Sequence, residues 1–162
     1  MGKHTLTIEY DYDFVLIGIS SYEKDYRICW ALNRVLGLGL TKKDSLEIKS
    51  KKQDTPSFFS LFNYENEEEF IEYSVIANLS EHKQFVSKEH SLFDKVAQES
   101  EETENGILIP EHKQMNYFIV IRGEMDNDKI EETVKKIKEI DIVLTAMRID
   151  AKELKSKKNL IF

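Results

Sequence analysis

Hydrophobic and polar residues alternate with a period of two over residues 4–12, and an apolar run follows at 14–19. Alternation predicts a half-buried strand, and a short apolar run predicts a buried one. Ser20-Ser21 offers a helix cap, because a serine hydroxyl can accept a backbone N–H of the first turn. Apolar positions at helical spacing predict a helix over about 22–36, which Gly37 ends.

The middle of the chain reads as strands separated by polar turns. A short strand is expected at 45–49, and a hairpin is expected from 58–64 and 70–79. The residues that join its two arms are almost all acidic or amide side chains, which is typical of a solvated turn. Periodicity then weakens, and an acidic stretch at 94–106 predicts a mobile loop.

The pattern becomes regular again after this stretch. A strand is expected at 116–122, a helix from a cap at 126–128 to about Glu139, and a strand at 142–149. Strand, helix and strand joined by short connections favour a right-handed crossover and a parallel strand pair. We therefore predict a single α+β domain over 1–162, with a mixed, mostly antiparallel sheet and helices packed on one face.

Composition and charge restrict the class of protein. Hydrophobic residues make up 41% of the 162 residues and charged residues 33%, which is typical of a folded globular chain. The net charge of −7 and four scattered arginines argue against nucleic-acid binding, which stays a minor alternative. The longest apolar runs are far shorter than the roughly 20 residues that cross a bilayer. A single cysteine, Cys29, fits a reducing compartment, so we expect a cytoplasmic protein without a membrane partner.

Candidate catalytic and metal residues are sparse. His82 and His90 are the nearest approach to a metal site, but the tight ligand pairs of zinc sites are absent. Cys29 lies among apolar residues of the predicted helix, which favours a structural role over a nucleophile. The glycine patterns of nucleophile elbows and phosphate loops are not spelled in the chain. We expect no catalytic residues, no metal and no cofactor.

Three groups of residues are candidates for binding. Tyr26, Trp30 and Asn33 share one face of the predicted helix, where large amphipathic rings suit either an interface or the core. Glu111 follows Pro110 and is expected to cap the turn before a strand by accepting backbone N–H groups. The tail ends in Leu160-Ile161-Phe162, which is apolar enough to dock on the body of the protein or on a partner.

The segment Ile109-Pro110-Glu111-x-x-x-Asn116-Tyr117 resembles the motif of the IPExxxDY family of uncharacterised Bacteroidota proteins. The stretches 16–21, 24–27, 30–33 and 154–162 are also similar to that family, so the resemblance covers most of the chain. It implies a cytoplasmic bacterial protein and no particular mechanism. Asn116 stands where the motif has Asp. An amide cannot supply the charge of a general base or metal ligand, which favours a hydrogen-bonding, structural role.

Three hypotheses follow from these patterns. The first is a non-catalytic accessory or protein-interaction module, whose partner is another protein or a second copy of the chain. The second is a small-molecule-binding regulatory domain, which requires a pocket at the corner of Glu111 and Asn116. The third is an enzyme that uses carboxylates such as Glu111, and Asn116 weakens it. The candidate binding residues are Glu111, Asn116, Tyr117, Tyr26, Trp30, Asn33 and Phe162.

Overall fold

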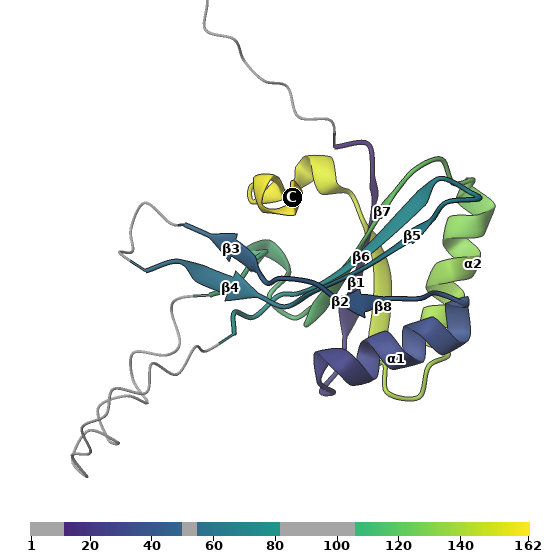
Figure 1. Ribbon diagram of the computed structural model, residues 1–162, viewed down its shortest axis with the longest axis horizontal. Coiled ribbons are helices and arrows are strands. Elements are labelled where there is room, and N and C mark those ends of the chain that lie inside the picture. Colours follow the sequence, from purple (N-terminus) through teal and green to yellow (C-terminus); the bar gives the residue numbers. More distant parts are fainter. Residues whose placement is uncertain (1–11, 50–54, 82–105) are drawn as a thin grey trace, which may run out of the picture.

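A computed structural model describes residues 12–49, 55–81 and 106–162 of the chain. Its centre is a six-stranded sheet with two helices on one face, which confirms the α+β class (Figure 1). In spatial order the strands are β2 (Thr41–Lys42), β5 (Leu61–Asn66), β6 (Ile71–Ala77), β7 (Tyr117–Arg122), β1 (Val15–Ser20) and β8 (Thr145–Ile149).

Every strand pair in the described part of the chain is antiparallel. The predicted parallel pair between β7 and β8 is wrong, because β1 lies between them. Ile17 of β1 faces Ile119 of β7, and Gly18 faces Met147 of β8. The strands β7 and β8 still run in the same direction, since both are antiparallel to β1. The helix between them therefore crosses over one intervening strand, a split strand–helix–strand unit.

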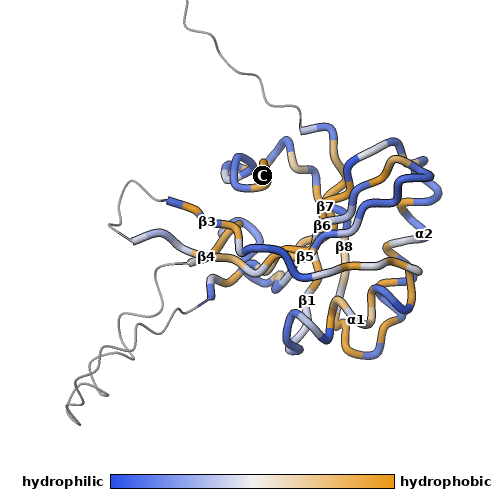
Figure 2. The backbone as a smooth tube through the Cα atoms, in the orientation of Figure 1, coloured by the Kyte–Doolittle hydropathy of each residue, from blue (hydrophilic) through white to orange (hydrophobic). Residues whose placement is uncertain are grey.

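Both helices pack on the same face of the sheet, which we call the helix face. They are α1 (Asp25–Leu36) and α2 (Asn127–Lys138), and each buries one apolar stripe against the strands. Ile28 and Leu32 of α1 meet Ile137 of α2 in a core with almost no solvent exposure. Figure 2 shows that the turn between β5 and β6 is hydrophilic.

The helix boundaries confirm some capping predictions and correct one. Gly37 ends α1 in the left-handed region at φ 66°, where glycine is favoured. The helix α2 begins after Asp126, one of its three expected cap positions, but the Asp126 side chain makes no capping hydrogen bond. The start of α1 was expected near Tyr22, but the helix begins at Asp25. The hydroxyl of Ser21 instead accepts the Glu23 N–H at 3.1 Å and donates to the Ile142 carbonyl at 2.6 Å.

Short segments pack against the opposite face of the sheet, which we call the cover face. They are the two-stranded sheet β3 (Leu46–Ile48) and β4 (Ser57–Phe59) with the 3₁₀ turns η1 (Pro110–His112), η2 (Ala151–Glu153) and η3 (Lys157–Leu160). The strand predicted over 58–64 is divided at Ser60, because β4 joins the small sheet while β5 stays in the large one. The described part of the chain therefore has three layers: the two helices, the six-stranded sheet, and the short segments on the cover face.

Two sequence-based expectations fall largely outside the described residues: the strand at 4–12 and the acidic loop at 94–106. Within the described ranges, no helix combines the length and the apolar character needed to cross a membrane.

Candidate functional site

The side-chain amide of Asn78, a buried residue outside the Ile-Pro-Glu segment, binds the backbone of residues 109–115. Asn78, only 1% exposed, accepts the Ile109 N–H at 2.8 Å through its side-chain oxygen. Its amide nitrogen donates to the carbonyls of His112 at 3.2 Å and Met115 at 2.8 Å. One side chain thus binds three backbone groups of a turn that has few hydrogen bonds of its own. This role of Asn78 was not predicted, and the sequence offers no spacing signal for it.

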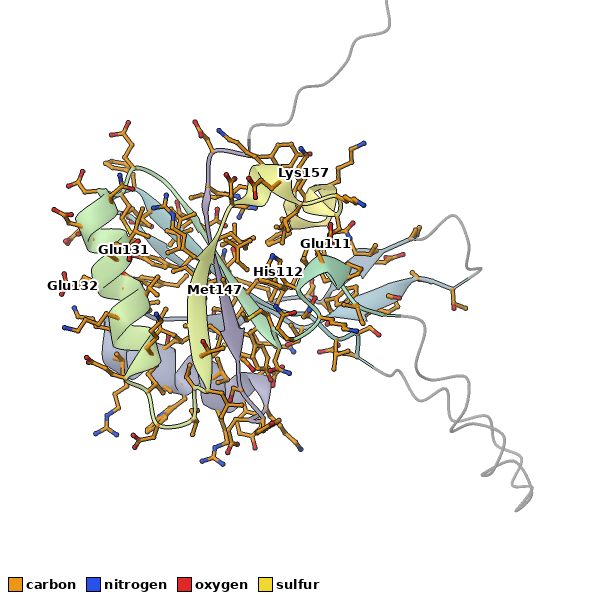
Figure 3. The ribbon with its side chains drawn as sticks, turned by 180° about the vertical axis from the view of Figure 1, so that it is seen from behind. Glu111, His112, Glu131, Glu132, Met147 and Lys157 are labelled. Atoms are coloured by element: carbon orange, nitrogen blue, oxygen red, sulfur yellow. The ribbon has the colours of Figure 1, made fainter. Side chains whose placement is uncertain are left out.

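Glu111 binds the C-terminal segment instead of capping its own turn. Its carboxylate accepts the Ser156 N–H at 2.9 Å and the Ser156 hydroxyl at 2.6 Å, which joins η1 to the start of η3 (Figure 3). Desolvation by partial burial opposes the charged form, but hydrogen bonds outweigh it, those from Ser156 together with backbone N–H groups of Glu111 and Lys155. They hold the pKa of Glu111 below its ordinary value. The carboxylate serves as a structural acceptor.

The apolar C-terminal tail docks on its own chain. Leu160 is fully buried, and its carbonyl accepts a guanidinium N–H of Arg122 at 2.9 Å. Asn159 donates from its amide to the Leu108 carbonyl at 2.9 Å, which ties the tail to the segment before η1. Phe162 is 40% exposed and its ring lies 4.9 Å from the Arg122 guanidinium carbon. The apolar character of the tail is therefore explained by its packing on its own chain.

Asn116 and Tyr117 act at the other side of the segment, where β7 begins. The side-chain oxygen of Asn116 accepts the Ser21 N–H at 2.8 Å and lies 3.4 Å from the Ser20 hydroxyl. Both contacts use an oxygen that aspartate also has, in line with the hydrogen-bonding role predicted for this position. Tyr117 donates its hydroxyl to the Glu23 carbonyl at 2.6 Å, and burial followed by the nearby Asp25 charge raises its pKa to about 12.

A cavity lies beside this pair and is called here the α1-end hollow. It has a volume of 840 Å³ and is bordered by the turn that leads into α1 (residues 21–25), by Ser60, by residues 77 and 79–81, and by Asn116 and Tyr117. Glu111 is not among the residues that border it. The predicted corner therefore divides into two places: Asn116 faces a cavity, and Glu111 faces the C-terminal segment.

A charged network forms one wall of this hollow. The Lys42 ammonium donates to Asp25 at 3.3 Å, to the Ser60 hydroxyl oxygen at 2.5 Å and to Glu81 at 3.0 Å. Ser60 donates its own proton to Asp25, and Ser45 donates to Glu81 at 2.8 Å. These residues come from four separate segments, so no motif in the sequence could have revealed them.

The protonation states of the network do not favour acid–base or nucleophilic catalysis. Burial disfavours the charged form of Lys42, but hydrogen bonds and charges of Glu81 and Asp25 outweigh it and raise its pKa. Burial acts against the Asp25 carboxylate too, and hydrogen bonds led by Ser60 hold its pKa below the ordinary value. Lys42 therefore stays charged and cannot act as a base for Ser60, which is itself only 3% exposed.

Cys29 lies on the helix face and is 2% exposed, as its predicted structural role requires. Burial, followed by the charge of Asp25, raises the pKa of its thiol to about 12. A thiol with this pKa carries almost no thiolate at neutral pH, so it behaves as a small apolar side chain.

The aromatic residues of α1 lie outside the core. Tyr26 is 59% exposed and Trp30 is 63% exposed, which excludes the core alternative for both. Asn33, the third member of the predicted face, instead ties down the chain after α1. It accepts the Leu40 N–H at 2.8 Å and donates to the Leu40 carbonyl at 3.2 Å. Arg34 stacks its guanidinium 5.4 Å from the centre of the Trp30 ring.

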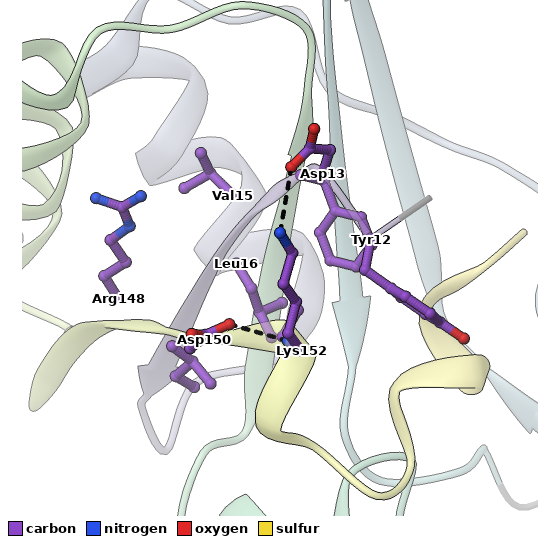
Figure 4. Close-up of a pocket in the computed structure, with 10 residues that line it drawn as sticks. Tyr12, Asp13, Val15, Leu16, Arg148, Asp150 and Lys152 are labelled. Carbon is purple, nitrogen blue, oxygen red and sulfur yellow. Dashed lines mark hydrogen bonds and ion pairs between the residues drawn. The ribbon is translucent and has the colours of Figure 1, made fainter. Parts of the chain in front are cut away.

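Two further hollows mark the surface. One, of 310 Å³, lies between the outer side of α1 and residues 139–142. The other, of 440 Å³, lies where β1 begins and β8 ends (Figure 4). There Lys152 pairs with Asp13 at 3.6 Å, and its N–H donates to Asp150 at 3.0 Å. Arg148, the other cation that borders this hollow, donates to the side-chain oxygen of Asn127 at 3.1 Å.

No group of three or more potential metal-ligating His, Cys, Asp or Glu side chains gathers among the described residues. His82 and His90, the two histidines considered from the sequence, lie outside them. Comparison of the chain with known protein families, with curated proteins and with solved structures found no match.

Proposed function

We propose that this protein is a non-catalytic interaction module whose contact surface is the outer face of α1. One observation carries the proposal: Tyr26 and Trp30, one helical turn apart, both expose large rings to solvent. Residues four apart on a helix are neighbours, so the two rings form one patch, which Arg34 continues by a further turn.

The energetics of the patch favour a partner. Aromatic residues have lower helix propensity than Ala, Glu or Lys, so they do not stabilise α1 at exposed positions. A Tyr or Trp side chain buries roughly 150–250 Å² when covered. With about 60% of each side chain exposed, covering one of them is worth on the order of 2–4 kcal/mol at about 25 cal/mol per Å². This free energy becomes available only when another molecule covers the rings.

The composition of the patch indicates the chemistry of the partner. Tyr, Trp and Arg are the residues most enriched at the energetic centres of protein interfaces. Arg27 and Arg34 are both exposed and border the 310 Å³ hollow beside Trp30. Glu139 and Asp141 border the same hollow, so its charges balance. A protein segment with an apolar side chain that fits this hollow and with polar groups of both signs around it matches these features.

The other candidate residues support this assignment by elimination. Glu111 is engaged by Ser156, and Leu160 of the tail is buried in its own chain. Neither the carboxylate nor the buried part of the tail is free to meet a partner. Deletion of the last three residues would remove a core side chain and would therefore test folding, not binding.

The experiment is co-purification of an N-terminally tagged chain from its native host, with two matched variants. The double variant Tyr26→Ala/Trp30→Ala removes the patch, and Phe70→Ala removes an even more exposed ring (84% exposed) from the β5–β6 turn. We expect one protein in near-equal amounts with the wild type and Phe70→Ala, and at least a roughly hundredfold loss with the double variant. Unchanged melting temperatures verify that both variants fold.

Two results would overturn the proposal: recovery of no stoichiometric partner, or equal recovery by the double variant. Trp30 is the single tryptophan of the chain, so its fluorescence gives a second measure. Its emission should move to shorter wavelength when a purified partner covers the ring.

A further inference from the structure

The charged side chains on the outer face of α1 are divided between its two ends. Glu23 lies in the turn before α1, and its carboxylate pairs with Arg27 at 2.9 Å, which places it on this face. Arg34 lies in the last turn of α1 and stacks on Trp30. About three helical turns separate Glu23 from Arg34, so the two lie along one line of the helix surface. The face therefore has negative charge at its start and positive charge at its end.

Two copies of this face are complementary when their helices pack antiparallel. A two-fold axis across the middle of α1 places the Glu23 of each copy beside the Arg34 of the other, so two equivalent ion pairs form. The same arrangement brings Arg27 of one copy against the Trp30 ring of the other, and a guanidinium is attracted to the face of such a ring. Parallel packing would oppose like charges at both ends. The charges thus select the antiparallel pair.

The hollow beside Trp30 supplies a concave surface for this pair. It lies close to the proposed axis, because Arg27, Trp30 and Ala31 in the middle of α1 border it. The exposed Trp30 ring of a second copy is therefore positioned over this hollow. The charged residues that border the hollow are Arg27, Arg34, Glu139 and Asp141, so positive and negative side chains are equal in number. An uncharged ring suits such a balanced site.

The exposed area fits a reversible dimer. Covered in both copies, Tyr26 and Trp30 together contribute about 350–600 Å², since each side chain is about 60% exposed and buries roughly 150–250 Å² in full. Val35, 41% exposed, and the aliphatic stems of the arginines add further area. Specific, stable interfaces bury roughly 1,200–2,000 Å², so this pair belongs at the weak end of the range.

We propose that the outer face of α1 binds the same face of a second copy, as an antiparallel two-fold pair with a dissociation constant on the order of 1–100 µM. This inference rests on the proposed function, because it names the partner of that surface. In a host that expresses tagged and untagged chains, the untagged chain should then co-purify. Recovery of a different protein instead would overturn the inference and leave the interaction surface in place.

Sedimentation velocity of the purified full chain measures self-association over about 1–200 µM. We expect the wild type and Phe70→Ala to change from monomer to dimer over this range, while Tyr26→Ala/Trp30→Ala stays monomeric. The Trp30 emission of the wild type should move to shorter wavelength over the same range. A wild-type chain that is monomeric at about 200 µM overturns the inference, and so does a double variant that dimerises normally.

Charge reversal tests the antiparallel pairing. Glu23→Arg and Arg34→Glu each place like charges at both contacts, and each alone should weaken self-association at least about tenfold. A mixture of the two variants restores opposite charges at both contacts, so it should dimerise within about threefold of the wild type. Glu131→Lys reverses an exposed charge on the outer side of α2 and should dimerise like the wild type.

This mixing experiment separates pairing from a loss of folding. A structural role of Glu23 or Arg34 within one chain cannot produce recovery when two impaired chains are combined. The pairing is overturned if both single variants dimerise normally or if their mixture stays monomeric. Melting temperatures verify the fold of each variant. The wild-type and Tyr26→Ala/Trp30→Ala series decide alone if a charge-reversed chain does not fold.

Discussion

The two faces of the central sheet are covered in different ways. On the helix face, α1 and α2 satisfy their own backbone groups and contribute mainly apolar side chains. On the cover face, the small sheet β3–β4 and 3₁₀ turns of three or four residues lie over an equally apolar core. Such segments leave many backbone groups without internal partners.

Side chains make up this deficit on the cover face. Asn78 binds three backbone groups of residues 109–115, Glu111 binds the N–H of Ser156, and Asn159 and Arg122 bind the carbonyls of Leu108 and Leu160. The helix face is thus held chiefly by packing, and the cover face by packing together with polar contacts between distant segments. The two faces should respond differently to the same substitutions.

The largest difference is expected from two asparagines. Asn78→Ala leaves the Ile109 N–H and the Met115 carbonyl without their side-chain partner in a buried site, and should lower the free energy of unfolding by about 3–5 kcal/mol. Asn33→Ala also removes two hydrogen bonds to the backbone, but the site near the end of α1 is partly exposed and water can replace them. It should cost about 1 kcal/mol. Urea denaturation measures both, and equal costs would show that Asn78 is not the main support of the cover face.

A smaller difference is expected from two leucines, both 0% exposed. Leu32→Ala leaves a cavity between α1 and the sheet that regular elements cannot close, and should cost about 4 kcal/mol. Leu160→Ala should cost about 2 kcal/mol, because η3 is a short 3₁₀ turn of four residues that can shift into the space. Thermal and urea unfolding of the pair give the comparison. A cost at Leu160 as large as at Leu32 would mean that the cover segment is held as rigidly as a helix.

The sequence predicted the helix face far better than the cover face, for a physical reason. Helical spacing from Ile28 to Leu36 and from Ile130 to Ile137 is a local signal, and each helix has more than three turns to display it. The segments on the cover face are too short to show a repeating pattern of hydrophobic residues. Their contacts, such as Asn78 with Ile109 at a separation of 31 residues, join positions that no local pattern relates.

Topology and site show the same limit. The strand–helix–strand pattern identified β7, α2 and β8, but periodicity does not report which strand lies between two others, and β1 was missed there. Helical spacing correctly predicted that Tyr26 and Trp30 share one face of α1. It could not predict that this face points to solvent, because that depends on which side of α1 packs on the sheet. The cluster of Asp25, Lys42, Ser60 and Glu81 exists only because four segments meet in the fold.

Glu111 offers the smallest effect and the sharpest test of polar support on the cover face. Its hydrogen bonds with Ser156 lower its folded pKa below the ordinary value of 4.5. A lowered pKa contributes stability above pH 4.5, and this contribution is lost as the pH falls through the folded pKa. Glu111→Gln keeps the shape without the charge, so at pH 7 it should cost at most about 1 kcal/mol, because the group is exposed.

The pH dependence separates this charge effect from a change in packing. The stability difference between wild type and Glu111→Gln should be constant from pH 7 to about pH 5, and should vanish below the folded pKa. Glu131→Gln, on the outer side of α2, should stay within about 0.5 kcal/mol of the wild type. A difference for Glu111→Gln that persists undiminished at low pH would assign the loss to altered contacts of the side chain. The carboxylate charge would then have no part in holding η3 to η1, and the cover face would depend on neutral hydrogen bonds and packing alone.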